Sequence, residues 1–286
     1  MKHVFIINPI HTKEMIHPFV QVIHEIMKGY DYDVRMSQYV NHASKIINEY
    51  QMPARFYSVG GDGMLSQVIQ SLVGTKHELV VIPYGTGNDF NRTIHDCQDA
   101  KKILETSLSQ ESQAIDVIKI NDHYAINSIC FGIDAVIANH VHDIVDIPFI
   151  SQDKSYIVSI FQNIASYPFH EVCIMQDKQK MYEGEVTLCV MGNGRYYGGG
   201  FEILPDAQID DGLMNVLVLP RIKKWQAPYY AARIVKRTLS SHKKTLTFTA
   251  RAIDIYTKTS CNCDGEEYQD SHYHLEVVPH SLLLII

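Results

Sequence analysis

The chain has 286 residues, enough for two domains, and is 46% hydrophobic and 20% charged, as is typical of globular proteins. Its formal net charge of −7 argues against a protein that binds nucleic acid through its overall charge. No stretch approaches the ~18 apolar residues that a membrane-spanning helix requires. Because an apolar strand follows Met1 almost directly, we expect no signal peptide and a cytoplasmic protein.

The six cysteines are scattered along the chain and predict reduced thiols rather than a disulfide framework. Cys261 and Cys263 are the only close pair, and no Cys-x-x-Cys spacing occurs. Zinc sites commonly use that spacing, so a structural zinc site is disfavoured.

The first part of the chain alternates strands with helices. Apolar runs predict strands at residues 4–7, 32–36, 54–59 and 79–82, and helical spacing predicts helices opened by Pro18, at residues 44–50, and from Met64. Such alternation predicts a doubly wound parallel sheet. Ligands of these sheets bind beyond the carboxyl ends of the strands, where this chain places small and polar residues.

A Gly-Gly-Asp-Gly turn at residues 60–63 joins a predicted strand to a predicted helix. Glycine allows a ligand to approach the backbone closely, and the unpaired amides at a helix start favour phosphate. Asp62 would then hold Mg²⁺ or take a proton from an attacking hydroxyl. The alternative is a tight turn in which Asp62 only caps the helix.

A second glycine-rich turn, Gly85-Thr86-Gly87-Asn88-Asp89, follows the fourth predicted strand. Two acidic glycine turns after neighbouring strands can face one polyphosphate and its metal ion. The alternative is again capping, here by Asn88 and Asp89 of the helix that contains Phe90.

The second part of the chain changes character after about Asn127. Short strand-like runs at residues 187–191, 214–219, 245–249, 252–257 and 275–278, with turns between them, predict an antiparallel, sandwich-like domain. The apolar run at the C-terminus, residues 282–286, must be buried.

Residues 221–244 carry eight Lys and Arg and no Asp or Glu, within a chain of net charge −7. Aromatic and apolar residues, among them Trp225 and Tyr229, are interleaved with them. A basic helix of this kind indicates a surface for anionic lipid headgroups. The alternatives are a solvated helix packed on the sandwich and, less favoured, a nucleic-acid patch.

These motifs resemble those of the soluble diacylglycerol kinase and sphingosine kinase family. The likeness extends over most of the chain and is carried by the two glycine turns, by the Asp116 strand, by residues 192–213, and by Asp264-Gly265-Glu266. The resemblance implies an ATP-binding domain at residues 1–127, joined by a returning segment at 279–286, and a lipid-binding β-sandwich domain at 128–278.

The resemblance also implies roles for single residues. Glu266 matches the family's proton acceptor, and it would form an acidic cluster with Asp62 and Asp89 around the transferred phosphate and its Mg²⁺. The residues around ATP would be Asn8, Ser37, Gly60, Gly61, Asp62, Gly63, Met64 and Thr86. A structural Mg²⁺ would be held by the Asp211 side chain and the carbonyls of Gln208 and Leu213, although an Asp-Asp-Gly turn needs no metal.

The sequence departs from the family pattern in three places. The opening loop, residues 8–13, lacks the usual glycine, Met64 replaces a common threonine, and Ser37 stands where threonine is usual. None of these changes removes a carboxylate, so we expect an active kinase.

We therefore expect an ATP- and Mg²⁺-dependent kinase of diacylglycerol or a similar lipid alcohol, peripherally associated with anionic membranes. One alternative is a kinase of the NAD kinase type, which shares the Gly-Gly-Asp-Gly turn. Another is a non-catalytic lipid- or nucleotide-binding relative. The sequence leaves the oligomeric state open, a homodimer included.

Overall fold

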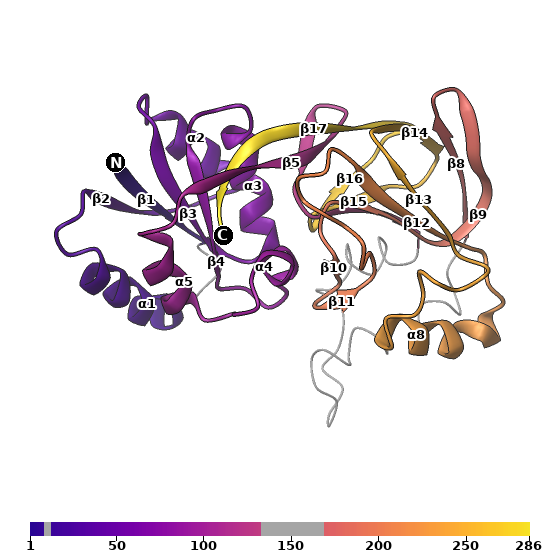
Figure 1. Ribbon diagram of the computed structural model, residues 1–286, viewed down its shortest axis with the longest axis horizontal. Helices are drawn as coiled ribbons and strands as arrows, with labels where there is room; N and C mark the ends of the chain where they lie inside the picture. Colours follow the sequence, from indigo (N-terminus) through magenta and orange to yellow (C-terminus); the bar gives the residue numbers. More distant parts are fainter. Residues whose placement is uncertain (9–12, 133–168) are drawn as a thin grey trace.

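The structure is a computed structural model that describes residues 1–8, 13–132 and 169–286. Two halves lie side by side, the helix-rich one near the N-terminus and the strand-rich one beyond it (Figure 1). Within the described residues, no helix is both long and apolar enough to cross a membrane.

The first half is built on a parallel sheet with strand order β2 (Tyr32–Met36), β1 (Lys2–Ile7), β3 (Ala54–Gly60), β4 (Glu78–Pro83). Strands β1, β3 and β4 are almost entirely buried, which explains their continuous apolar sequences. The carboxyl ends of all four strands therefore meet at one edge of the sheet.

Helices cover both faces of this sheet, which confirms the doubly wound prediction (Figure 1). Side chains of α1 (Lys13–Ile26) and α5 (Ala100–Ser107) share a core with one face. Side chains of α2 (His42–Asn48) and α3 (Asp62–Leu72) share a core with the other. The short helix α4 (Asp89–Ile94) follows the second glycine turn.

The predicted start of the first helix at Pro18 is wrong. Helix α1 begins at Lys13, so Pro18 lies within it. Proline is favoured in the first turn of a helix, where a main-chain N–H would have no acceptor within the helix. In α1 a further turn precedes Pro18.

The second half is an antiparallel assembly, as predicted from its short strand-like runs. Its strands are β5 (Ser112–Ile120), β6 (His123–Ala125), β7 (Ser128–Gly132), β8 (His170–Gln176), β9 (Gln179–Gly192), β10 (Tyr196–Tyr197), β11 (Phe201–Glu202), β12 (Met214–Pro220), β13 (Leu246–Ala250), β14 (Ala252–Thr257), β15 (Cys261–Cys263) and β16 (Glu266–Tyr268). Their alternating side chains enclose a core of aliphatic and aromatic residues.

Strand β17 (His272–Ile285) connects the two halves. Its beginning pairs with β14, its length pairs with β5, and near its end Leu283 and Leu284 pair with β4 of the parallel sheet. A bulge between Val278 and Leu282, with His280 at a φ of 50°, separates the two parts. The apolar C-terminal run is therefore buried as part of the first half's core.

The basic stretch is not one long helix. A short 3-10 turn, η2 (Lys224–Gln226), leads into α8 (Ala227–Val235), and of the eight cations only Arg233 lies in α8 itself. Pro228 stands at the helix start, where it is tolerated. The remaining cations lie in the segments that flank α8.

Candidate active site

The two glycine-rich turns meet backbone to backbone at the carboxyl edge of the sheet. A methyl group on Gly85 would lie 2.4 Å from the Gly61 Cα and 2.8 Å from the Gly61 nitrogen, which no side chain can accept. The Asn88 side chain closes the second turn by accepting the Gly85 N–H at 3.1 Å and donating to the Gly85 carbonyl at 2.7 Å. Glycine is thus required at Gly85 by close packing.

Asp62 caps the helix that begins with Asp89. Its carboxylate accepts the main-chain N–H groups of Asp89 at 3.1 Å and Phe90 at 3.2 Å. Burial raises the pKa of Asp62, although these amides act in the opposite direction. The residue predicted as catalytic therefore also holds the second turn in place.

Asp89 is buried, and its side chain reaches into the second half of the molecule. It accepts the N–H groups of Gly199 at 2.9 Å and Gly200 at 2.6 Å, in the turn between β10 and β11. Burial and repulsion from Asp62 raise the pKa of Asp89 to about 6. A methyl group on Gly87 would lie 3.0 Å from Asp62 Oδ2 and 4.0 Å from Asp89 Oδ2, so both carboxylates flank this glycine.

Glu266 approaches the same place from the second half. It opens β16, and its Oε1 lies 4.0 Å from the position that a methyl group on Gly63 would occupy. Glu266 is half-buried, and burial raises its pKa. The structure thus brings Glu266 to the start of α3, while the neighbouring Glu267 is exposed.

Of the other residues predicted around ATP, Asn8, Met64 and Thr86 lie at or beside these turns, and Ser37 follows β2. Asn8 lies against Gly60, because a methyl group there would be 3.3 Å from the Asn8 Cβ. Ser37 is buried at the end of β2, and Thr86 is exposed in the second turn. Met64 is buried in α3 and its N–H donates to the Gly61 carbonyl. Residues 9–12 of the opening loop lie outside the described part of the chain.

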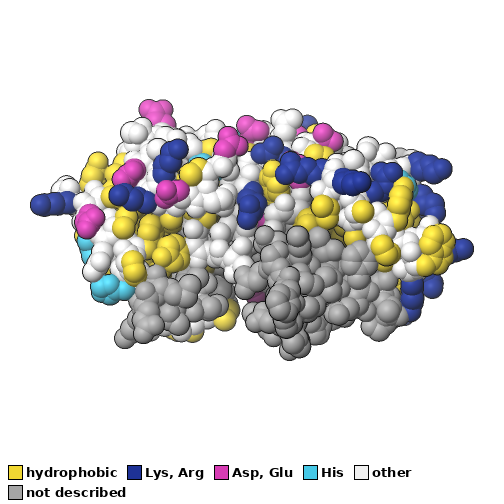
Figure 2. Space-filling view, turned by 90° about the horizontal axis from the view of Figure 1, so that it is seen from below, with side chains coloured by type: hydrophobic (Ala, Val, Ile, Leu, Met, Phe, Trp, Pro, Cys, Tyr) yellow, Lys and Arg dark blue, Asp and Glu magenta, His cyan; other side chains and the backbone are white. Residues whose placement is uncertain are grey.

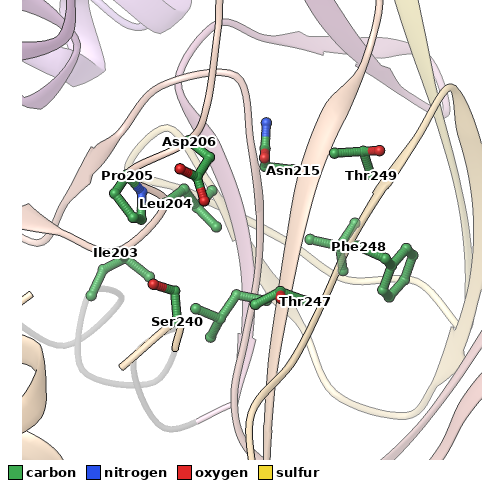
Figure 3. A pocket seen from close by; sticks show the side chains of 11 residues that line it. Ile203, Leu204, Pro205, Asp206, Asn215, Ser240, Thr247, Phe248 and Thr249 are labelled. Atoms are coloured by element: carbon green, nitrogen blue, oxygen red, sulfur yellow. The ribbon is translucent and has the colours of Figure 1, made fainter. Parts of the chain in front are cut away.

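A cavity of about 240 Å³ opens beside Glu266. It is lined by Val40, Asn41, Ser66, Gln67, Gln70, His123, Glu266, Glu267 and Tyr268. A cavity of about 180 Å³ in the second half is lined by none of the predicted site residues, and its Asp206 lies among Ile203, Leu204 and Pro205 (Figure 3). We therefore assign the first cavity to the candidate active site.

The predicted structural metal set lies on an exposed turn. One Asp211 carboxylate oxygen accepts the Leu213 N–H at 2.9 Å, so the Asp211 side chain itself closes the turn. The preceding amide, that of Gly212, donates at 2.6 Å to the fully buried Asp116. A metal held by Asp211, Gln208 and Leu213 stays a prediction.

The carboxylates of the active site suit a hard cation that also binds substrate. Among the described residues no group of three or more His, Cys, Asp or Glu converges as a metal cage. Magnesium is commonly held by one or two carboxylates, with water and substrate phosphates completing its shell. Asp62 and Asp89, which flank Gly87, provide that number of carboxylates.

The sequence predicted no role for Asp264, although it is buried and stands two residues before Glu266. Burial raises the pKa of Asp264 to about 7, and its carboxylate accepts three successive main-chain amides, those of Ile126, Asn127 and Ser128. These partners lie more than 130 positions away in sequence. The only local signal is the Asp-Gly pair, which is typical of a tight hairpin turn.

Comparison with known proteins places the chain in a family. A family model described as "Diacylglycerol kinase catalytic domain" matches residues 2–120, and one described as "YegS C-terminal NAD kinase beta sandwich-like domain" matches residues 127–286. The chain therefore belongs to the YegS-like lipid kinases of the diacylglycerol kinase family, and it is a kinase.

Two curated relatives have similar lengths. The chain is 27% identical over 271 residues to "Probable lipid kinase YegS-like" of Shewanella frigidimarina. This match covers 91% of this chain and 85% of that protein. It is 26% identical over 246 residues to the protein of the same name from Alcanivorax borkumensis, covering 79% and 77%.

Solved structures share the fold. A diacylglycerol kinase from Bacillus anthracis matches with a TM-score of 0.76 and 22% identity, covering 99% of this chain and 96% of that chain. An NAD kinase from Archaeoglobus fulgidus in complex with ATP matches with a TM-score of 0.54 and 12% identity, covering 100% and 93%. The parallel sheet with an antiparallel second half is thus common to both kinds of kinase.

Proposed function

We propose that the protein transfers the γ-phosphoryl group of ATP to the hydroxyl of a neutral lipid alcohol, diacylglycerol or a close analogue, with Mg²⁺ as cofactor. The observation that carries the proposal is the approach of Glu266, from the second half, to Gly63 at the start of α3. A carboxylate able to take a proton therefore stands beside the helix start where phosphate would bind.

The first half would hold ATP. The main-chain amides at the start of α3 would receive its phosphates, with Asn8, Ser37 and Thr86 around them. The cavity of about 240 Å³ would take the nucleoside, because Gln67 and Asn41 offer amide groups and none of the described residues that line it is Lys or Arg. Residues 1–127 with 279–286 would thus form the ATP-binding domain and residues 128–278 the lipid-binding domain.

The chemistry asked of the chain is positioning and proton transfer. Mg²⁺, when bound, would neutralise charge on the transferred phosphate. Asp62 and Asp89 would hold it beside Gly87. Glu266 would accept the proton of the lipid hydroxyl as the oxygen attacks phosphorus, and its raised pKa brings it closer to the pH at which a general base works best.

The lipid substrate would be reached from the membrane surface. Trp225 and Tyr229 are exposed, whereas Ala227, Tyr230 and Ala231 pack inward, so α8 has an outer and an inner face. Seen from below, Lys and Arg side chains gather over the half of the molecule that carries α8 (Figure 2). We propose that this basic, aromatic surface docks on anionic membranes and that the enzyme is a peripheral cytoplasmic protein.

Incubation with labelled ATP and Mg²⁺, with either mixed-micelle diacylglycerol or NAD as acceptor, tests the proposed function. We expect label in lipid and none in NAD. Phosphorylated NAD with untouched lipid would make the protein an NAD kinase, whose fold it shares. Label in neither acceptor, together with ATP binding, would favour a non-catalytic relative.

A further inference from the structure

Ile126 and Asn127 connect β6 to β7 at a place where the two hydrophobic cores meet, since Ile126 belongs to the core of the first half and Ile129 to that of the second. We call residues 126–128 the crossover. Three successive N–H groups at this crossover donate to one carboxylate, that of Asp264: Ile126 at 2.6 Å, Asn127 at 3.1 Å and Ser128 at 2.8 Å. Both oxygens are engaged, and the side chain is only 5% exposed. Hydrogen bonds to a carboxylate are stronger than neutral ones, so this attachment is firm.

Asp264 and Gly265 form the two-residue turn between β15 and β16, and both have positive φ, 48° and 93°. Positive φ at both central positions is the requirement of a type I′ hairpin turn. The Asp264 N–H also donates to the Ser128 carbonyl at 3.0 Å. Both the main chain and the side chain of Asp264 therefore bind this turn to the crossover. Glu266 is the first residue after the turn.

The crossover is bound in turn to the loop that receives Asp89. The Asn127 carbonyl accepts the N–H groups of Asn193 and Gly194, both at 3.0 Å, and the Asn127 side chain donates to the Tyr196 carbonyl at 3.0 Å. This loop continues to the glycines whose amides hold Asp89. One crossover segment thus fixes both structures that the second half contributes to the site.

We propose that Asp264 is the positioning residue of the active site: it fastens the Glu266 turn to the crossover and so sets the place of Glu266 relative to the start of α3. Asp264 touches neither reactant in this role. Displacing a catalytic group by about 1 Å can cost ~10²-fold in rate. The inference rests on the proposed role of Glu266 as proton acceptor and adds the residue that keeps it in place.

The test compares Asp264→Asn with the matched control Asp177→Asn, the same substitution at an exposed aspartate in the turn between β8 and β9, where φ is a similar 49°. Asparagine keeps the size of the side chain but directs an NH₂ group at a main-chain N–H. We expect kcat for lipid phosphorylation to fall ~10²-fold while the Kd for ATP, measured by equilibrium dialysis, changes less than threefold. Hydrogen exchange should show faster exchange at residues 126–128 and in the Glu266 peptide, with the control unchanged in every measurement.

Asp264→Glu keeps the charge and should recover part of kcat. A normal kcat for Asp264→Asn, or equal losses of kcat, ATP affinity and melting temperature, would overturn the proposal, and so would failure of both variants to fold. Wild-type protein that phosphorylates no lipid would instead refute the proposed function. The exchange measurement separates the two failures, because it reports the attachment of the Glu266 turn without any turnover.

Discussion

The Asp62 carboxylate accepts the main-chain N–H of Asp89 at 3.1 Å, so the first acidic turn caps the helix that the second one begins. The two predicted catalytic acids are therefore one hydrogen-bonded unit at the carboxyl edge of the sheet. Asp89 then binds Gly199 and Gly200 of the second half. A substitution of either acid should therefore alter the position of the other acid and the contact between the two halves.

The contact between the glycine turns predicts a large effect of one methyl group. Gly85→Ala places that group 2.4 Å from the Gly61 Cα, so the turns must separate and stability should fall by about 1–3 kcal/mol or more. Gly63→Ala is the matched control, because its methyl group meets nothing closer than Glu266 at 4.0 Å and it lies in a helix. Urea unfolding of both variants checks the prediction, and equal stabilities would contradict it.

Repulsion between the acids predicts a shift in titration. Burial and the charge of Asp62 raise the pKa of Asp89 to about 6, so Asp62→Asn should lower the pKa of Asp89. Carboxyl-carbon NMR titration of wild type and variant measures this directly. If the pKa of Asp89 is unchanged in the variant, burial alone raises it and the two side chains do not interact.

The same raised pKa predicts how stability depends on pH. Because the folded state holds the Asp89 proton up to about pH 6 and the unfolded state releases it near pH 4, this group's contribution to stability is full below pH 4 and is lost as the pH rises through about 6. The loss is at most about 3 kcal/mol. Asp89→Asn cannot titrate, so its unfolding free energy should fall less between pH 4.5 and 6.5. Parallel curves for the two proteins would contradict the assignment.

The membrane surface predicts binding that depends on charge and salt. Reversing Lys223 and Lys224 to Glu should weaken co-sedimentation with anionic vesicles by at least roughly 30-fold at low salt, since each lost Lys removes ~1 kcal/mol of attraction and each new Glu adds repulsion. Added salt should release the wild type. Lys101 and Lys102, exposed on α5, provide a control reversal that should leave binding unchanged. Equal binding by all three proteins would mean that the docking surface lies elsewhere.

Local patterns were enough to predict the doubly wound half, because its strands are buried runs and its helices are amphipathic. Local patterns were less reliable where tertiary contacts determine the bounds of an element. Strand β17 was predicted only as the separate runs 275–278 and 282–286, because pairing with β5 and β4 carries it past the bulge at His280. The basic stretch was predicted as one helix because charge spacing does not reveal where a chain turns.

The sequence predicted only part of the site, because the rest depends on tertiary contacts. Asp62, Asp89 and Glu266 stand in motifs beside glycines, and the structure brings them to one place. Asp264 was seen only as part of the Asp-Gly-Glu motif, and its role was not predicted, because its partners at residues 126–128 are distant in sequence and are main-chain amides. No local pattern could have indicated that one carboxylate would bind all three.

The central claim, that Glu266 takes the proton of a lipid hydroxyl, is tested most directly by Glu266→Gln with labelled ATP and a total lipid extract. Thin-layer separation of the products identifies the substrate without presuming it. We predict one labelled lipid for the wild type, a ~10²–10⁴-fold slower appearance of it for the variant, and unchanged ATP binding. Near-normal labelling by Glu266→Gln would contradict the account and pass the role of proton acceptor to Asp62.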